Sequence, residues 1–202
     1  MAKRRYRFAI IQRPKLRHDK QEFHGLIARA GRVPGLSNGT DVLTIRPVTT
    51  KDEAAVWSII EPIVRAGETY ALPLEMTQID ALRYWTGPDR ETFIAEENGS
   101  ILGTYYIRAN QSGGGSHVAN CGYMTHVSAQ GRGIARRMCE HSLDYARERG
   151  FRAMQFNFVV STNEQAVRLW QSLGFDIVGR LQLAFRRPSG SYVDAFVMFR
   201  AL

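Results

Sequence analysis

Cysteine is scarce in this 202-residue chain, which holds only Cys121 and Cys139. Two cysteines cannot build the disulfide framework of a small secreted domain, so we expect reduced, apolar side chains in a cytoplasmic protein. Long hydrophobic runs are also lacking, because no stretch of 18 apolar residues occurs, and this argues against a membrane-spanning segment. The composition, 44% hydrophobic and 23% charged residues, is otherwise typical of a globular protein.

Acidic residues are nearly lacking in the first 40 positions. Ten Lys or Arg residues stand there against Asp19 and Glu22, whereas residues 41–202 carry 17 basic and 17 acidic side chains. The net charge of +8 therefore belongs to residues 1–40. We expect a basic, flexible extension there, with contact to acidic surfaces or organelle targeting as alternatives. The balanced remainder gives no reason to expect a nucleic-acid partner.

Hydrophobic periodicity predicts one α/β domain over residues 41–202. Strands are expected at 41–48, 92–97, 101–109, 117–127, 151–160, 175–185 and 192–201, and helices at 49–67, 77–86, 133–149 and 163–173. Thr50 and Glu53 suggest a capping box for the first helix, and Asn98-Gly99 indicates a hairpin turn. The order predicts an antiparallel meander followed by a right-handed parallel crossover. The sheet should therefore be mixed and mostly antiparallel, with one central parallel pair and four flanking helices.

The segment VSAQGRGIARRM (127–138) joins a strand directly to a helix. Gly131 and Gly133 would let a ligand approach the backbone, and a helix N-terminus offers unpaired N–H groups and partial positive charge. The same end carries three arginines, Arg132, Arg136 and Arg137. Because they oppose the helix dipole, they favour a bound anion, although a simple turn is the alternative. A dinucleotide fingerprint fails, since Arg136 stands where a third glycine is required.

The residues Gln130 to Ala135 (QGRGIA) resemble the Gln/Arg-x-x-Gly-x-Gly/Ala motif of the GCN5-related N-acetyltransferases (GNATs). The segment STNEQAVRLWQSLGF (161–175) is similar to the second signature of that family, and the order of elements is similar as well. The resemblance implies that residues 41–202 form a GNAT acetyltransferase domain, whose central parallel strands splay around an acetyl-CoA cleft. It implies an N-acetyltransferase activity with acetyl-CoA as the cofactor.

The same resemblance places the cofactor. Its pyrophosphate would lie on the amides of residues 131–136, and its pantetheine arm would pair with the strand ending at Val127, near which a backbone N–H would stabilise the oxyanion. Asn163 is expected both to cap a helix and to contact the cofactor. The residues expected to hold acetyl-CoA are Val127, Gln130, Gly131, Arg132, Gly133, Ile134, Ala135, Arg136, Asn163 and Trp170.

Trp170 departs from the family pattern. Most members have a tyrosine there, whose hydroxyl protonates the departing thiolate, and an indole N–H has no useful acidity. Tyr105, Tyr106 and Tyr123 are candidate replacements, although tyrosines in strands usually serve packing. A thiolate with a pKa near about 8.5 can also leave without full protonation.

A narrower resemblance concerns the acceptor. HVANCGYM, FNFVVSTN and RLWQSLGF are similar to fungal acetyltransferases of proline analogues such as azetidine-2-carboxylate, in which three asparagines stand at the positions of Asn120, Asn157 and Asn163. The resemblance implies a small-molecule amine as acceptor, an amino acid or a cyclic imino acid. Asn120 and Asn157 would then contribute to both catalysis and substrate binding.

A base should help to deprotonate the acceptor amine. His126, Glu68 and Asp194 are the candidates, and His126 is preferred because it lies beside the expected thioester. Glu68 and Tyr70 belong to the loop between the first two helices, which lines the acceptor pocket in the family, so both are expected to bind substrate.

Two other functions remain open at this point. A protein or peptide N-acetyltransferase would need an exposed peptide groove, and a non-catalytic acetyl-CoA sensor would explain Trp170. No metal site is expected, and the protein could be a monomer or a homodimer.

Overall fold

The computed structural model describes residues 42–202, so the expected basic extension at 1–40 lies outside the described residues. The helices are α1 (Glu53–Ala66), α2 (Gln78–Trp85), α3 (Ile134–Glu148) and α4 (Glu164–Ser172). The strands are β1 (Thr44–Pro47), β2 (Glu91–Glu97), β3 (Ser100–Ala109), β4 (Val118–Thr125), β5 (Ala153–Val160), β6 (Asp176–Arg186) and β7 (Tyr192–Ala201). The order of elements expected from the sequence is confirmed. In this part of the chain, no helix combines the length and the apolar character needed to cross a membrane.

The strands form one mixed sheet in the order β1-β2-β3-β4-β5-β7-β6. Neighbouring strands are antiparallel except β4 and β5, which are parallel. The expected mixed sheet with a single central parallel pair is therefore confirmed.

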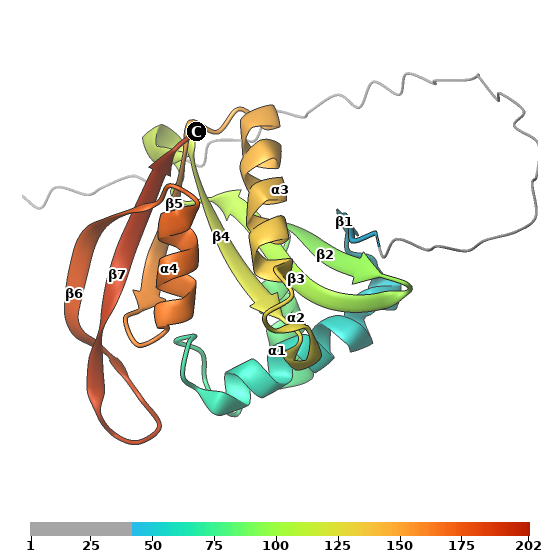
Figure 1. Ribbon diagram of the computed structural model, residues 1–202, viewed down its shortest axis with the longest axis horizontal. Coiled ribbons are helices and arrows are strands. Elements are labelled where there is room, and N and C mark those ends of the chain that lie inside the picture. Colours follow the sequence, from blue (N-terminus) through green and yellow to red (C-terminus); the bar gives the residue numbers. More distant parts are fainter. Residues whose placement is uncertain (1–41) are drawn as a thin grey trace, which may run out of the picture. The chain divides into compact units, whose positions relative to one another are not determined.

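Two pairs of helices pack on the sheet, α3 with α4 and α1 with α2 (Figure 1). Alternating side chains of the central strands belong to the two separate cores beneath these pairs. Tyr105 and Ile107 of β3 join the core under α3 and α4, whereas their neighbour Tyr106 joins the core under α1 and α2. This period of two is what a strand buried on both faces requires. Both faces of the central strands are thus covered, and ligands can reach the sheet only where strands separate.

Gly103 of β3 lets α3 approach the sheet closely. A Cβ at this position would stand 2.8 Å from Met138 Cε and 3.0 Å from Ile134 Cγ2, both on α3. Such distances are well inside normal van der Waals contact, so the side chains of Met138 and Ile134 would have to move to make room for a side chain here. Gly103 therefore supports the close approach of α3 to β3.

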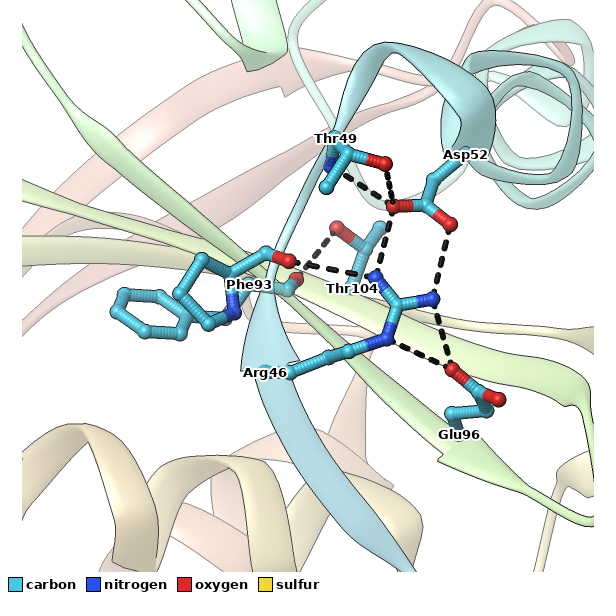
Figure 2. A network of polar contacts seen from close by, with 7 residues as sticks. Arg46, Thr49, Asp52, Phe93, Glu96 and Thr104 are labelled. Carbon is cyan, nitrogen blue, oxygen red and sulfur yellow. Dashed lines mark hydrogen bonds and ion pairs between the residues drawn. The ribbon is translucent and has the colours of Figure 1, made fainter. Parts of the chain in front are cut away.

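An ion-pair network anchors the start of α1 to the sheet (Figure 2). Arg46 of β1 donates to both carboxylate oxygens of Asp52, at 2.8 and 2.9 Å, and its Nε donates to Glu96 at 2.8 Å. The backbone N–H and the hydroxyl of Thr49 donate to the same Asp52 carboxylate. The guanidinium of Arg46 holds the pKa of Asp52 well below its usual range. The cap is therefore Thr49 with Asp52, and the predicted pair of Thr50 and Glu53 is wrong by one residue.

Candidate active site

The two central parallel strands pair over only a short distance. The pairing of β4 with β5 consists of Val118 with Ala153 and Ala119 with Met154. Beyond these residues the register of β5 with β7 shifts between Phe156 and Val159, as a β-bulge would produce. A bulge bends its strand, so β5 turns away and opens a split in the sheet beside β4.

A pocket of about 270 Å³ occupies this split. Its walls come from the α1–α2 loop, α2, β3, β4, β5 and α4, so elements from both faces of the sheet line it. Of the residues predicted for the site, those that line it are Tyr70, Asn120, Asn157, Asn163 and Trp170. The structure therefore brings together five predicted residues that are separated by up to 100 positions in the chain.

Two side-chain amides, those of Asn120 and Asn157, line one wall of the pocket and are held there by hydrogen bonds. Asn120 Nδ2 donates to the carbonyl of Gln155 at 2.9 Å and so replaces a ladder bond where β4 and β5 separate. Gln155 Nε2 donates to Asn157 Oδ1 at 2.8 Å, and Asn157 Nδ2 donates to Asn110 Oδ1 at 2.6 Å. Each amide has more than one bond to give or accept. The chain fixes Asn157 in the pocket and leaves it further capacity for a ligand.

Tyr70 reaches from the α1–α2 loop to the open edge of β4. Its hydroxyl accepts from the N–H of Tyr123 at 2.9 Å and donates to the carbonyl of the same residue at 2.8 Å. Burial raises the pKa of Tyr70, so the phenol stays protonated at neutral pH. The backbone N–H and C=O groups of successive residues point alternately to the two sides of a strand. Those of Cys121 and Thr125 therefore point to the same side as those of Tyr123, away from β3 and toward the split beside β4. One strand edge therefore faces the pocket.

The glycine loop after β4 leads into the N-terminus of α3. A short 3-10 helix, Val127–Ala129, precedes Gln130, and Val127 is exposed. Gly131 and Gly133 both have φ of 76°, a conformation that favours glycine, and no atom stands within 4 Å of where a Cβ would be at either position. The first N–H groups of α3 lack helical partners and face this open space. The loop therefore fits the phosphates of a nucleotide cofactor.

Two of the three arginines at this end of α3, Arg132 and Arg136, have protein partners. Arg132 forms an ion pair with Glu97, and Arg136 donates to Ser172 of α4 at 2.7 Å and lies 3.8 Å from Glu140. The conflict between these charges and the helix dipole is smaller than the sequence suggested. The case for an anion at this loop rests on the glycines and the backbone N–H groups.

The side chains of Ile134 and Ala135 lie in different environments. Ile134 is buried in the core, and Ala135 is partly exposed. Their expected contribution to cofactor binding is therefore through backbone N–H groups.

Helix α4 supplies the remaining predicted cofactor residues. Asn163 caps the helix, because its Oδ1 accepts from the N–H of Ala166 at 3.4 Å. The ring of Trp170 packs against Tyr123 and Phe156, with ring centroids 5.0 and 5.2 Å apart. Trp170 is therefore held rigidly beside the pocket, although its indole supplies no acid.

The tyrosines considered as replacement acids point elsewhere, except for one. The hydroxyl of Tyr105 bonds to His141 Nδ1, and that of Tyr123 bonds to Ser142 Oγ at 2.7 Å, so both hydroxyls point toward α3, although Tyr123 also contributes to the lining of the pocket. Tyr106 lines the pocket and packs over Gly122. Burial raises the pKa of Tyr106, which makes it a weak acid.

The candidate bases do not line the pocket. Glu68 forms an ion pair with Arg187 at 2.8 Å, and His126 uses Nδ1 to accept from the N–H of Ser128. The N–H of Leu183 donates to Asp194, and this bond together with Arg180 holds the pKa of Asp194 below its usual range, which weakens it as a base. No carboxylate or imidazole occurs among the described residues that line the pocket. The substrate-binding and base roles predicted for Glu68 thus find no support in its position.

Sequence reasoning missed two polar pocket residues. Tyr84 of α2 and Arg108 of β3 line the pocket. Arg108 is paired directly opposite Asn120 in the β3–β4 register. The signal that could have found it is the alternation of the strand ILGTYYIRA, since a charged residue two positions after a buried tyrosine shares the face of that tyrosine.

Comparisons with known proteins agree with this geometry. The model of the acetyltransferase (GNAT) family matches residues 57–175, which contain the glycine loop and most of the pocket. The N-acetyltransferase aca1 of Schizosaccharomyces pombe is 30% identical over 151 residues, which cover 66% of this chain and 72% of that protein.

Solved structures share the fold. A GCN5-related N-acetyltransferase from Kribbella flavida is 41% identical, has a TM-score of 0.75, and is matched over 79% of this chain and 98% of its own. A phosphinothricin acetyltransferase from Sinorhizobium meliloti, solved in complex with acetyl-CoA, is 21% identical, with a TM-score of 0.71 and coverage of 79% and 88%. At that identity the likeness concerns the fold alone.

Proposed function

This chain belongs to the acetyltransferase (GNAT) family and is an N-acetyltransferase that uses acetyl-CoA; on this basis we propose that its acceptor is the amine of a small molecule. More narrowly, we propose an amino acid or a cyclic imino acid such as azetidine-2-carboxylate. The observation that carries the proposal is the pocket in the split sheet, which has a volume of about 270 Å³ and a wall of amide side chains.

The size and the lining of the pocket support a small, polar acceptor. Pockets for drug-sized ligands usually measure about 300–1,000 Å³, so this one suits a smaller molecule. Asn120 and Asn157 offer hydrogen bonds from one side, and the rings of Tyr84, Tyr106 and Trp170 offer apolar surface from the others. A few fixed polar groups in an aromatic pocket favour one orientation of a small ligand.

A contact between two loops argues against a peptide acceptor. Glu68 in the α1–α2 loop is joined to Arg187 in the β6–β7 turn, and a Cβ at Gly67 would stand 3.1 Å from Pro188. An extended peptide needs an open groove, and these two loops touch. The contact therefore supports a small molecule over a protein acceptor.

The proposed mechanism is positioning by fixed groups. When bound, acetyl-CoA supplies an acetyl group as a thioester. The N–H groups after Gly131 and Gly133 would hold its phosphates, and the open backbone groups of β4 near Thr125 and Val127 would orient its arm and donate to the acetyl carbonyl. Asn157 would hold the acceptor for attack, and such orientation alone can lower a barrier by about 7–11 kcal/mol.

Among the lining residues that belong to positions 42–202, no side chain is a suitable base. We therefore propose that the acceptor amine reacts in its neutral form and passes its proton to water rather than to the protein. A cytoplasmic location stays a prediction, and so does the choice between monomer and homodimer.

A free-thiol assay with acetyl-CoA tests the proposal directly. Amino acids, cyclic imino acids, simple amines and peptides would be supplied as acceptors, and release of CoA would be followed. The proposal expects turnover of amino or imino acids and little with peptides. Turnover of peptides alone would support the protein acetyltransferase, and tight binding of acetyl-CoA without turnover of any acceptor would support the sensor.

A further inference from the structure

Two buried side-chain nitrogens stand out at one side of the pocket. Among the described residues, the buried side-chain atoms without a hydrogen-bond partner are Arg90 Nη1 and Arg108 Nε. Both arginines bind the same carboxylate, that of Asp89. Buried donors are nearly always paired, so two unpaired nitrogens in one cluster need an explanation.

The aromatic rings account for the nitrogen of Arg90. Its guanidinium lies over the rings of Tyr84 and Tyr106, at 5.0 and 4.7 Å from their centroids. Ring faces attract a cation, and they stabilise Arg90 without a further acceptor. Its Nε and Nη2 already bind Asp89 in a bidentate pair.

Nothing comparable accounts for Arg108. Only its Nη1 is used, in a bond of 3.1 Å to Asp89, and within residues 42–202 no acceptor bonds to its Nε or Nη2. The Nε is enclosed by protein, whereas the guanidinium as a whole keeps N–H donors to spare, and hydrogen bonds from a guanidinium to a carboxylate are among the strong ones. Arg108 lines the pocket, and its side chain keeps 34% of its surface exposed, so a ligand can reach the guanidinium.

The charges of the cluster do not balance. Asp89 is shared by two guanidinium groups, and its pKa is held below the usual range chiefly by Arg90, so it stays ionised. One carboxylate against two cations leaves one positive charge beside the pocket. No acidic side chain among the described lining residues compensates it. A ligand that carries one negative charge would do so.

We propose that Arg108 is a specificity-determining residue whose guanidinium binds the carboxylate of the acceptor. The inference rests on the proposed function and narrows it to amines that carry a carboxylate. Arg108 lies directly opposite Asn120 on the neighbouring strand, so the acid group would be held beside the amide wall that includes Asn157. The acceptor is thereby an amino or imino acid with a free acid group.

A matched pair of acceptors and two matched variants test this. Azetidine-2-carboxylate is compared with its primary amide, which keeps the ring and the amine and lacks the charge. Arg108→Met keeps approximately the length of the side chain and removes the guanidinium. The control variant, Arg83→Met, removes an exposed arginine of α2 whose ion-pair partner within residues 42–202 is Asp80. The readouts are kcat/KM for both acceptors, acetyl-CoA affinity and the melting temperature.

We expect the wild type to prefer the acid over the amide by about 10²-fold, because an unpaired buried donor penalises the amide. Arg108→Met should remove this preference by lowering kcat/KM for the acid and leaving kcat/KM for the amide unchanged. Arg83→Met should change neither value. Arg108→Lys should restore only part of the preference, since an ammonium lacks the fork.

Other results would overturn the inference. If Arg108→Met lowers kcat/KM equally for the acid and the amide, the role of Arg108 is structural. If the wild type has the same kcat/KM for both acceptors, there is no carboxylate site. Either result leaves the proposed small-molecule function intact. If no small amine is acetylated at all, the proposed function fails and the role of Arg108 falls with it.

Discussion

At the scale of single residues, Asn157 is the side chain on which the acceptor site depends most. It is held between Gln155 and Asn110 and lines the pocket. Asn157→Ala should lower kcat/KM for the acceptor by about 10²-fold, roughly 2.7 kcal/mol, because a bond made to the reacting molecule is lost. The affinity for acetyl-CoA, measured by calorimetry, should stay close to that of the wild type.

Gln155 and Asn120 provide the controls for that experiment. Gln155→Ala removes a support of Asn157 without removing a pocket group, so its effect on kcat/KM should be smaller. Asn120 bridges the separating strands, so Asn120→Ala should also lower the melting temperature. Lost stability in Asn157→Ala with unchanged activity per folded molecule would show that Asn157 is purely structural.

Several site residues could be predicted singly, while their partners could not. The local pattern predicted Asn163 as a helix cap, and the family resemblance predicted Asn120, Asn157 and Trp170 as site residues. Tyr70 binds Tyr123 across 53 positions of the chain, and Glu68 binds Arg187 across 119. Such contacts depend on tertiary packing, which a local pattern does not contain. Glu68 was therefore mistaken for a pocket residue.

At the scale of elements, the loop at the start of α3 should decide cofactor binding. Gly133→Val forces a branched side chain into a conformation with φ of 76° and fills the open space over the helix N-terminus. Acetyl-CoA affinity should fall by at least about tenfold, or roughly 1.4 kcal/mol. Calorimetric titration of the folded variant measures the change.

Gly150 offers a control on the same helix. It follows the C-terminus of α3, has φ of 82°, and also has no atom near the place of a Cβ. Gly150→Val therefore carries similar backbone strain away from the loop. Equal losses of affinity in both variants would mean that strain, and not the loop, is responsible.

The anchor of α1 gives a prediction for stability against pH. The folded-state pKa of Asp52 is held below its unfolded value of about 3.9, so its contribution is fully present above that pH and is lost as the pH falls toward the folded pKa. Asp52→Asn should lower the free energy of unfolding by about 1–2 kcal/mol at pH 7, since Arg46 is partly exposed.

The difference between wild type and variant should shrink when denaturant unfolding is repeated below about pH 4, where the unfolded carboxyl is protonated. Asp144→Asn removes an exposed pair with Arg147 and should have a smaller effect. A pH-independent difference for Asp52→Asn would mean that packing, not charge, links α1 to β1.

The elements themselves were largely predictable, and their ends were less so. Asn98-Gly99 forms the expected turn, with φ of 50° and 76°. The capping box was predicted one residue too late: it is formed by Thr49 and Asp52 at the 3-10 turn Thr50–Asp52 that leads into α1, where Arg46 of β1 also binds Asp52. The split between β4 and β5 was expected only from the family resemblance, since the shift of register at Phe156 has no clear local signal.

At the scale of the whole molecule, the residues of the pocket predict how kcat/KM depends on pH. Burial raises the pKa of Tyr70, Tyr106 and Cys121, so these groups stay protonated at neutral pH and produce no inflection there. The logarithm of kcat/KM should therefore rise with a slope near one until the pKa of the acceptor amine is reached. Two acceptors with different amine pKa values should give correspondingly different inflections.

An inflection near about pH 6.5 that is the same for both acceptors would contradict this account. It would indicate a protein base such as a histidine. His126→Ala would then be the variant to examine, because His126 was the preferred base on sequence grounds.

The central claim is that this acetyltransferase modifies a small amine in the split of its sheet. The most direct measurement is a competition in one tube, with acetyl-CoA, azetidine-2-carboxylate and a peptide with a free N-terminus at equal concentrations, followed by mass spectrometry. The account predicts that the imino acid gains the acetyl group and the peptide stays unmodified. Acetylation of the peptide alone would contradict it, and so would the absence of any transfer by an enzyme that binds acetyl-CoA.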